Sequence, residues 1–83
     1  MSRFFFDIDD GMRRSRDREG TDLASLEEVR REAIGILPDI AREELPDGDH
    51  RTFACHVRDE SGVVIFTASL TLSAAWTTPS EGA

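Results

Sequence analysis

The clearest structural signal in this sequence is a helix start in the stretch Ser25-Leu26-Glu27-Glu28-Val29-Arg30-Arg31-Glu32-Ala33. The Ser25 hydroxyl can accept a hydrogen bond from the Glu28 amide while the Glu28 carboxylate returns to the Ser25 amide, as in a capping box. Apolar residues then recur at steps of three and four, at Leu26, Val29, Ala33, Leu37 and Ile40. At about 100° per residue they form one stripe. The stretch therefore predicts an amphipathic helix that needs a second layer to cover its apolar side.

Two residues within this helix disfavour it, Gly35 and Pro38. In a helix interior, glycine costs ~1 kcal/mol and proline ~3 kcal/mol relative to alanine. Both positions point away from the apolar stripe, where a bend convex toward solvent is tolerated. We therefore predict one kinked helix from Ser25 to about Glu44, with two short helices meeting at Pro38 as the alternative.

Two strands are predicted before the helix. Residues 3–9 alternate between an apolar face and a mixed face, which is typical of a strand. Asp10-Gly11 follows with the chemistry of a hairpin turn, because both residues tolerate positive φ. Residues 12–17 would return as a polar edge strand, and a second turn at 17–20 leads toward the helix.

Two more strands are predicted after the helix, at Arg51–Asp59 and Val63–Ser73, joined by the turn Asp59-Glu60-Ser61-Gly62. The whole pattern predicts an α+β fold of order β-β-α-β-β. It would have two layers, a four-stranded antiparallel sheet with the single helix on one face. A right-handed crossover from the second strand to the third most simply skips over the first, which gives the spatial order 2-1-3-4.

The chain is short enough for one domain. We assign residues 1–73 to that domain and residues 74–83, which contain Pro79 and Gly82, to a flexible C-terminal tail.

One helix can cover only one face of the predicted sheet. The residues predicted to face the helix are Phe4, Phe6, Ile8, Phe53, Cys55, Val57, Val64, Phe66, Ala68, Leu70 and Leu72. The far face would then carry Phe5, His56, Val63 and Ile65. A partly apolar patch of this kind on a small protein is typical of an interface.

The composition excludes several classes of protein. Charged residues make up 33% and hydrophobic residues 39%, and the apolar ones are periodic, so the chain is globular. No apolar run approaches the ~20 residues that span a bilayer, and the acidic start does not resemble a signal peptide. The net charge of −7 opposes binding to nucleic acid or anionic lipid. A single cysteine, Cys55, fits the reducing cytoplasm.

The opening Arg3-Phe4-Phe5-Phe6-Asp7-Ile8-Asp9-Asp10-Gly11 resembles the start of a family of short bacterial proteins with no assigned function. The resemblance continues through Asp17, Glu19-Gly20, the Ser25–Ala33 helix and the hairpin at 57–62, and it spans about residues 1–73. Pro38 departs from the family's pattern. The resemblance implies no activity, because the family carries none.

A second likeness is to the N-terminal half of HicB-type antitoxins, which also place a hairpin before a helix resembling Leu26-Glu27-Glu28. Those proteins have an extra strand before the helix, for which the sequence leaves no room between Asp17 and Ser25. This likeness implies protein binding.

We predict no catalytic residue, no metal site and no cofactor. A divalent cation could be bound by the cluster Asp7, Asp9, Asp10, Asp17 and Glu19, but the series does not match a calcium loop, and solvated turn charge explains it better. Cys55 and His56 are adjacent on a strand, so their side chains point to opposite faces and cannot share a zinc ion. Burial of Cys55 beside Phe53 also disfavours a nucleophile.

The most distinctive charge feature is the patch Arg13, Arg14, Arg16 and Arg18. It could bind an anion or an acidic partner, but it lacks the interleaved aromatic residues that stack on bases. The interpretation we favour is an edge strand whose charges deter sheet-to-sheet aggregation.

These observations predict a non-enzymatic protein-interaction module that acts through its sheet face or edge, as a homodimer or with another protein. The alternative is a small nucleic-acid-binding or antitoxin-like regulator that uses the Arg13–Arg18 patch.

Overall fold

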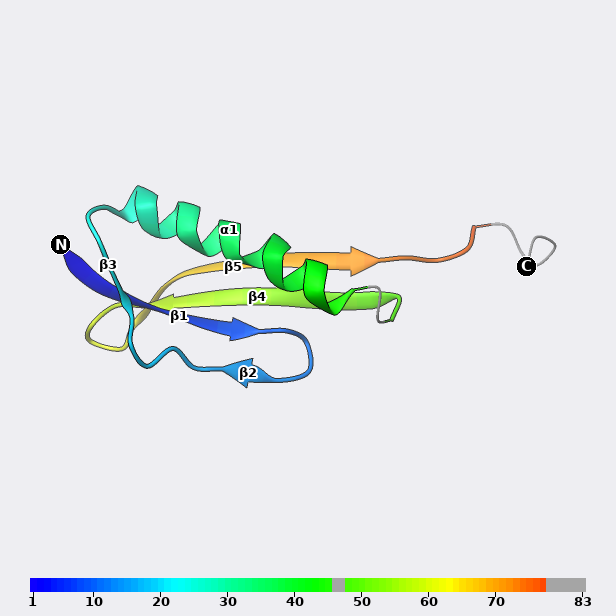
Figure 1. Cartoon of the computed structure of the whole chain (residues 1–83), viewed down its shortest axis with the longest axis horizontal. Coiled ribbons are helices and arrows are strands. Elements are labelled where there is room, and N and C mark those ends of the chain that lie inside the picture. The colour runs from blue at the N-terminus through cyan, green and yellow to red at the C-terminus, as the bar shows by residue number, and fades with distance from the viewer. Residues whose placement is uncertain (46–47, 78–83) are drawn as a thin grey trace.

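The computed structural model describes residues 1–45 and 48–77, in which one helix lies across one face of a sheet (Figure 1). The elements follow the order β1 (Ser2–Asp9), β2 (Arg14–Ser15), β3 (Thr21–Leu23), α1 (Leu26–Glu44), β4 (His50–Arg58) and β5 (Val64–Ser73). The predicted α+β class and the strand–helix–strand order are confirmed. The sheet has five strands, however, not four.

The strand order across the sheet is β2-β1-β4-β5, and every pairing is antiparallel. This agrees with the order predicted for the four expected strands. The additional strand, β3, pairs with the start of β1, whereas β2 pairs with its end. The returning strand predicted at 12–17 is therefore only two residues long, and the prediction that no strand fits between Asp17 and Ser25 is wrong. Three residues are too few to show a sequence period.

Helix α1 starts as the capping box predicts. The Ser25 hydroxyl accepts from the Glu28 amide at 3.2 Å, and the Glu28 carboxylate accepts from the amide of Ala24, one residue before the expected donor. The helix is continuous through Pro38, so one helix, not two, is confirmed. Proline cannot donate to the carbonyl of Ile34, but both residues are exposed, and water can reach that oxygen.

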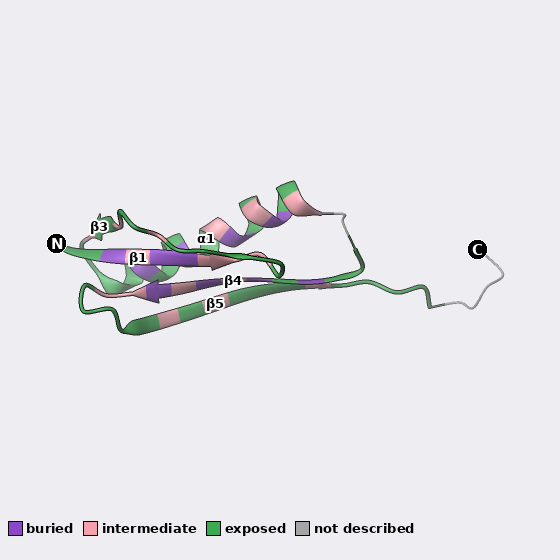
Figure 2. Cartoon of the chain, turned by 90° about the horizontal axis from the view of Figure 1, so that it is seen from below, coloured by how far each residue is buried: buried purple, intermediate pink, exposed green. Residues whose placement is uncertain are grey.

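The core lies between α1 and the two central strands, β1 and β4 (Figure 2). Its buried residues are Phe4, Phe6, Val29, Ala33, Leu37, Ala41, Phe53, Cys55 and Val57. Strand β5 contributes less, because Phe66 and Ala68 are only partly buried and Leu70 is 40% exposed. The prediction that the helix covers all the inward-facing residues of β5 is therefore wrong for Leu70, and Phe66 and Ala68 are covered only in part.

One residue of β5 lies on the face opposite to the one predicted. The pairing of β4 with β5 shifts between Val57 and Arg58, so that Val57 opposes Phe66 but Arg58 opposes Val64. Directly opposed residues share a face. Val64 is therefore on the outer face with Arg58, and it is 52% exposed.

Beyond β5, the Ala74 amide donates to the Asp49 carbonyl at 2.8 Å, and Trp76 is 97% exposed. The remainder of the predicted tail, 78–83, lies outside the described residues. Among the described residues, no helix combines the length and the hydropathy that crossing a bilayer requires.

The same substitution at two glycines should change stability in opposite directions. Gly35 lies in the helix, and an added Cβ would meet nothing within 4 Å, so Gly35→Ala should raise the free energy of unfolding by ~0.5–1 kcal/mol. Gly20 has φ +76°, and its Cβ would lie 2.7 Å from Arg3 Cγ and 2.8 Å from Phe5 Cε2. Gly20→Ala should therefore lower it by at least ~1 kcal/mol. Urea unfolding followed by circular dichroism measures both; a neutral Gly20→Ala would contradict the packing of Gly20 against β1.

Candidate functional site

The edge of β1 has a gap between its two short partner strands, and Asp17 fills it. Phe6 lies midway between the residues paired with β3 and those paired with β2. Its amide donates to Asp17 Oδ2 at 3.0 Å, while Asp17 Oδ1 accepts from the amides of Glu19 and Gly20 at 3.1 Å. The Asp17 carboxylate thus accepts the hydrogen bond that a backbone carbonyl of a neighbouring strand would otherwise accept from Phe6.

Next to Asp17, an ion pair between Asp7 and Arg58 crosses from β1 to β4. Arg58 Nε donates to Asp7 Oδ2 at 2.7 Å and Nη2 donates to Asp7 Oδ1 at 3.0 Å, and both side chains are nearly buried. Arg58 Nη2 also donates to the Asp17 carbonyl at 2.9 Å, and the Asp17 amide donates to Asp7 Oδ1. Asp7, Asp17 and Arg58 therefore form one connected cluster, called here the outer-face network.

Both carboxylates of this network are ionised at neutral pH. The hydrogen bond from Arg58 lowers the pKa of Asp7, against the opposing effect of burial. At Asp17 burial is the largest single influence and raises the pKa, but the amides of Phe6, Gly20 and Glu19 together lower it below the usual value. Neither group holds a proton to donate, and their acceptor oxygens are already used. The network suits structure better than acid–base chemistry.

The structure places the four predicted interface residues in different surroundings. Phe5 is half-buried: the Arg58 guanidinium lies over its ring at 5.0 Å, and Gly20 packs against its edge. His56 is half-buried, with Nε2 3.3 Å from Arg14 Nη2 and Nδ1 3.3 Å from Thr67 Oγ1. Only Val63 and Ile65 are well exposed. The four do not form one open apolar patch.

The predicted arginine patch lies on and around β2, and all four residues are exposed. Arg14 lies 3.7 Å from Asp9 and contacts His56. In the described part of the chain, no ion pair involves Arg13, Arg16 or Arg18. The patch is a set of solvated side chains along the outside of the β1–β2 hairpin.

The acidic residues of the first hairpin mainly fix its turns. Asp9 accepts from the Gly11 amide, and Asp10 accepts from the amides of Met12 and Arg13, all at 2.9 Å. In residues 1–45 and 48–77, no three His, Cys, Asp or Glu side chains are grouped as a metal site would require.

Cys55 lies at the centre of the core and is fully buried. Burial, together with the negative charges of Asp7, Asp17 and Glu32, raises the pKa of its thiol to about 11. The thiol is therefore protonated at neutral pH, which does not suit a nucleophile.

The predicted order places the last strand at an edge of the sheet, but sequence reasoning missed that this edge of β5 is unprotected. Strand β5 pairs with β4 on one side, and no strand in the described chain pairs with its other side. Its ten residues, Val64–Ser73, contain no charge and no proline. Natural edge strands usually carry such protection. A signal was present in the sequence: residues 61–80 contain no charged side chain, in a chain of which 33% is charged.

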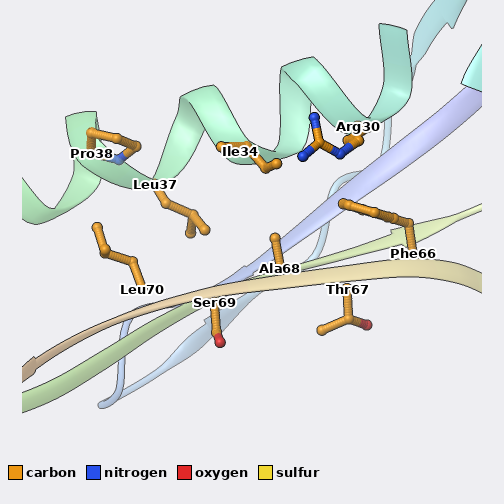
Figure 3. A pocket seen from close by; sticks show the side chains of 9 residues that line it. All are labelled: Arg30, Ile34, Leu37, Pro38, Phe66, Thr67, Ala68, Ser69 and Leu70. Atoms are coloured by element: carbon orange, nitrogen blue, oxygen red, sulfur yellow. The ribbon is translucent and has the colours of Figure 1, made fainter. Parts of the chain in front are cut away.

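A groove of about 390 Å³ runs along this edge, between α1 and β5. It is lined by Arg30, Ile34, Leu37, Pro38, Phe66, Thr67, Ala68, Ser69 and Leu70. Phe66, Ala68 and Leu70 rise from β5 toward Ile34 and Leu37 of the helix, while Thr67 and Ser69 point away (Figure 3). Ile34 and Leu70 are each 40% exposed. The open edge and this largely apolar groove form one continuous surface.

A family model described as a domain of unknown function, DUF6894, matches residues 3–71. The match begins in β1 and ends two residues before the end of β5. No curated protein and no solved structure matches the chain. The match agrees with the resemblance to a family without an assigned function.

The outer-face network should make stability depend on acid pH. Folding lowers the pKa values of Asp7 and Asp17. As the pH falls, these two carboxylates are therefore protonated at a higher pH in the unfolded chain than in the folded one. The stability they contribute is full above the unfolded value near 3.8 and is lost as pH falls below it. Urea unfolding at pH 7, 5 and 3 should show the main loss between pH 5 and 3.

Asp7→Asn should lower the free energy of unfolding at pH 7 by about 1–3 kcal/mol, because it weakens hydrogen bonds to a charged group. It should also flatten the loss between pH 5 and 3. Glu43→Gln is the control, because it changes the net charge equally at an exposed position for which the described residues show no ion pair. Equal curves for the two variants would contradict the role of the network.

Proposed function

This chain belongs to the DUF6894 family, a domain of unknown function, and we propose that it is a non-enzymatic protein-interaction module whose binding site is the open edge of β5. The observation that carries the proposal is the long uncharged edge strand beside an apolar groove.

Backbone groups supply the binding energy at such an edge. Along the outer side of β5, amides and carbonyls have no strand partner in the described chain. An incoming extended segment can satisfy them in order, as in binding by strand addition. Recognition of this kind does not require a specific partner sequence, because the hydrogen bonds are made by the backbone.

The groove adds selectivity to the edge. Every second side chain of an added strand would point toward α1 and pack beside Ile34 and Leu70, which are both partly exposed now. Burial of that apolar area contributes ~25 cal/mol per Å². A partner segment with alternating apolar residues is therefore favoured over a polar one.

The other surfaces support this assignment less well. The outer-face network has its donors and acceptors satisfied, and Cys55 is buried and protonated. The arginine patch retains three solvated cations, yet the net charge of −7 works against a polyanion. We therefore place protein binding before the regulator of nucleic acid that the Arg13–Arg18 patch would suggest.

The proposal is tested with a strand probe, a synthetic peptide of residues 63–73 flanked by two lysines at each end. Hydrogen–deuterium exchange is measured on the chain at about one micromolar, alone and with excess peptide. We expect slower exchange in β5 when the peptide is present. A peptide of scrambled order with the same flanks controls for attraction between lysine and an acidic protein.

Ile34→Glu places a charge in the groove and should abolish the protection of β5. Gly35→Glu adds the same charge on the helix side away from the groove and should retain it. If β5 exchange responds neither to the peptide nor to a hundredfold increase in protein concentration, the edge accepts no strand and the proposed function is wrong.

A further inference from the structure

We infer that the occupant of the β5 edge is a second copy of this chain, paired antiparallel through a two-fold axis close to Ala68. The inference rests on the proposed function, because it names the partner of the same site. Two copies would form one continuous sheet across the joined β5 strands, with their helices side by side on one face.

Charge is the first argument for a second copy. Each chain carries −7, so the electrostatic cost of bringing two copies together is lowest where both are free of carboxylates. The β5 edge meets this condition, since residues 61–80 are uncharged and, among the described residues, the one ionised side chain that lines the groove is Arg30. A basic foreign strand, in contrast, would find no carboxylate there to select it. The edge therefore matches a neutral strand, and β5 is itself one.

Symmetry is the second argument. In an antiparallel pair about a two-fold axis at Ala68, Ala68 opposes Ala68, and Phe66 opposes the second copy's Leu70. This register keeps the inward-facing residues on one side of the joined sheet, as the pleat requires. It also centres the two grooves on each other, because the β5 residues that line each groove run from Phe66 to Leu70. The small side chain of Ala68 at the axis leaves room for Ile34 from both helices.

The available area is the third argument. Ten residues of strand extend roughly 34 Å at about 3.4 Å per residue, and a helix on a sheet is roughly 15–20 Å thick at its edge. Each copy would therefore bury on the order of 500–700 Å², which reaches the lower end of stable interfaces at about 1,200 Å² in total. A lone peptide would cover the sheet layer and leave much of the helix flank exposed. We expect a dimer that forms reversibly and dissociates on dilution.

The register is tested by disulfide trapping. Opposed residues in antiparallel strands have Cα atoms about 4.5–5.5 Å apart, within the range that a disulfide spans. Ala68→Cys should therefore yield a covalent dimer under mild oxidation. The native Cys55 gives little background because it is fully buried.

Ser73→Cys is the matched control on the same strand. It is more exposed than Ala68, yet in the proposed register the two copies of residue 73 lie roughly 34 Å apart, so it should not cross-link. A mixture of Thr67→Cys and Ser69→Cys chains should form mixed dimers in preference to either homodimer, because these exposed positions oppose each other across the axis. This second pair tests the register even if Ala68→Cys fails to fold.

Light scattering coupled to size-exclusion chromatography measures the oligomeric state in solution without cross-linking. The wild type and Gly35→Glu should be dimers at hundreds of micromolar and shift toward monomers on dilution, and Ile34→Glu should be monomeric throughout. A wild type that is monomeric at every concentration, with Ala68→Cys cross-linking no faster than Ser73→Cys, overturns the second copy as partner. In that case slower β5 exchange with the strand peptide would still support an edge for another protein. Cross-linking at Ser73 but not at Ala68 overturns the antiparallel register.

Discussion

The structure depends on one geometric constraint: a single helix is narrower than the sheet that it covers. An α-helix with its side chains is about 10–12 Å wide, whereas four strands at about 4.8 Å spacing span roughly 19 Å. Helix α1 packs most closely on the central strand β4, where Phe53 and Val57 are buried. Strand β5 is left under the flank of the helix, so its inward side chains are only partly covered. The groove lies between the helix and this partly covered strand.

In the described part of the chain, no helix or second sheet covers the outer face, and side chains of the sheet itself cover part of it. Arg58 lies over the Phe5 ring and forms an ion pair with Asp7. Asp7 also accepts a hydrogen bond from the Asp17 amide. Further along, the Thr52 and Thr71 hydroxyls are 3.0 Å apart. These contacts need no partner protein, because stacked arginine and paired polar groups cover the apolar atoms below them. This supports our proposal that a partner binds at the edge of β5 and not on the outer face.

The parts of the fold that are predictable from the sequence rest on local patterns. The Ser25–Glu28 capping box and the three- and four-residue apolar steps specify α1, and the alternation in β1 and β4 specifies their buried faces. Where the prediction fails, the cause is a non-local contact. Asp17 bridges a gap that exists only once β2 and β3 have paired with the two ends of β1. Val64 changes face because of a register shift opposite Arg58. Alternation alone cannot reveal either, since it assumes uninterrupted pairing.

The two edges of the sheet differ in how their backbone groups are protected. At the β1 edge, two short strands and the Asp17 carboxylate satisfy backbone groups, and the exposed arginine patch lies beside them. At the β5 edge, no charge and no proline protects ten residues rich in β-branched and apolar side chains. An acidic chain of this size has ample charge to place there, yet its carboxylates and arginines lie elsewhere. An unprotected edge of this kind readily pairs with another strand. The feature that makes β5 a hazard for aggregation is therefore also the basis of our proposal that it binds a partner strand.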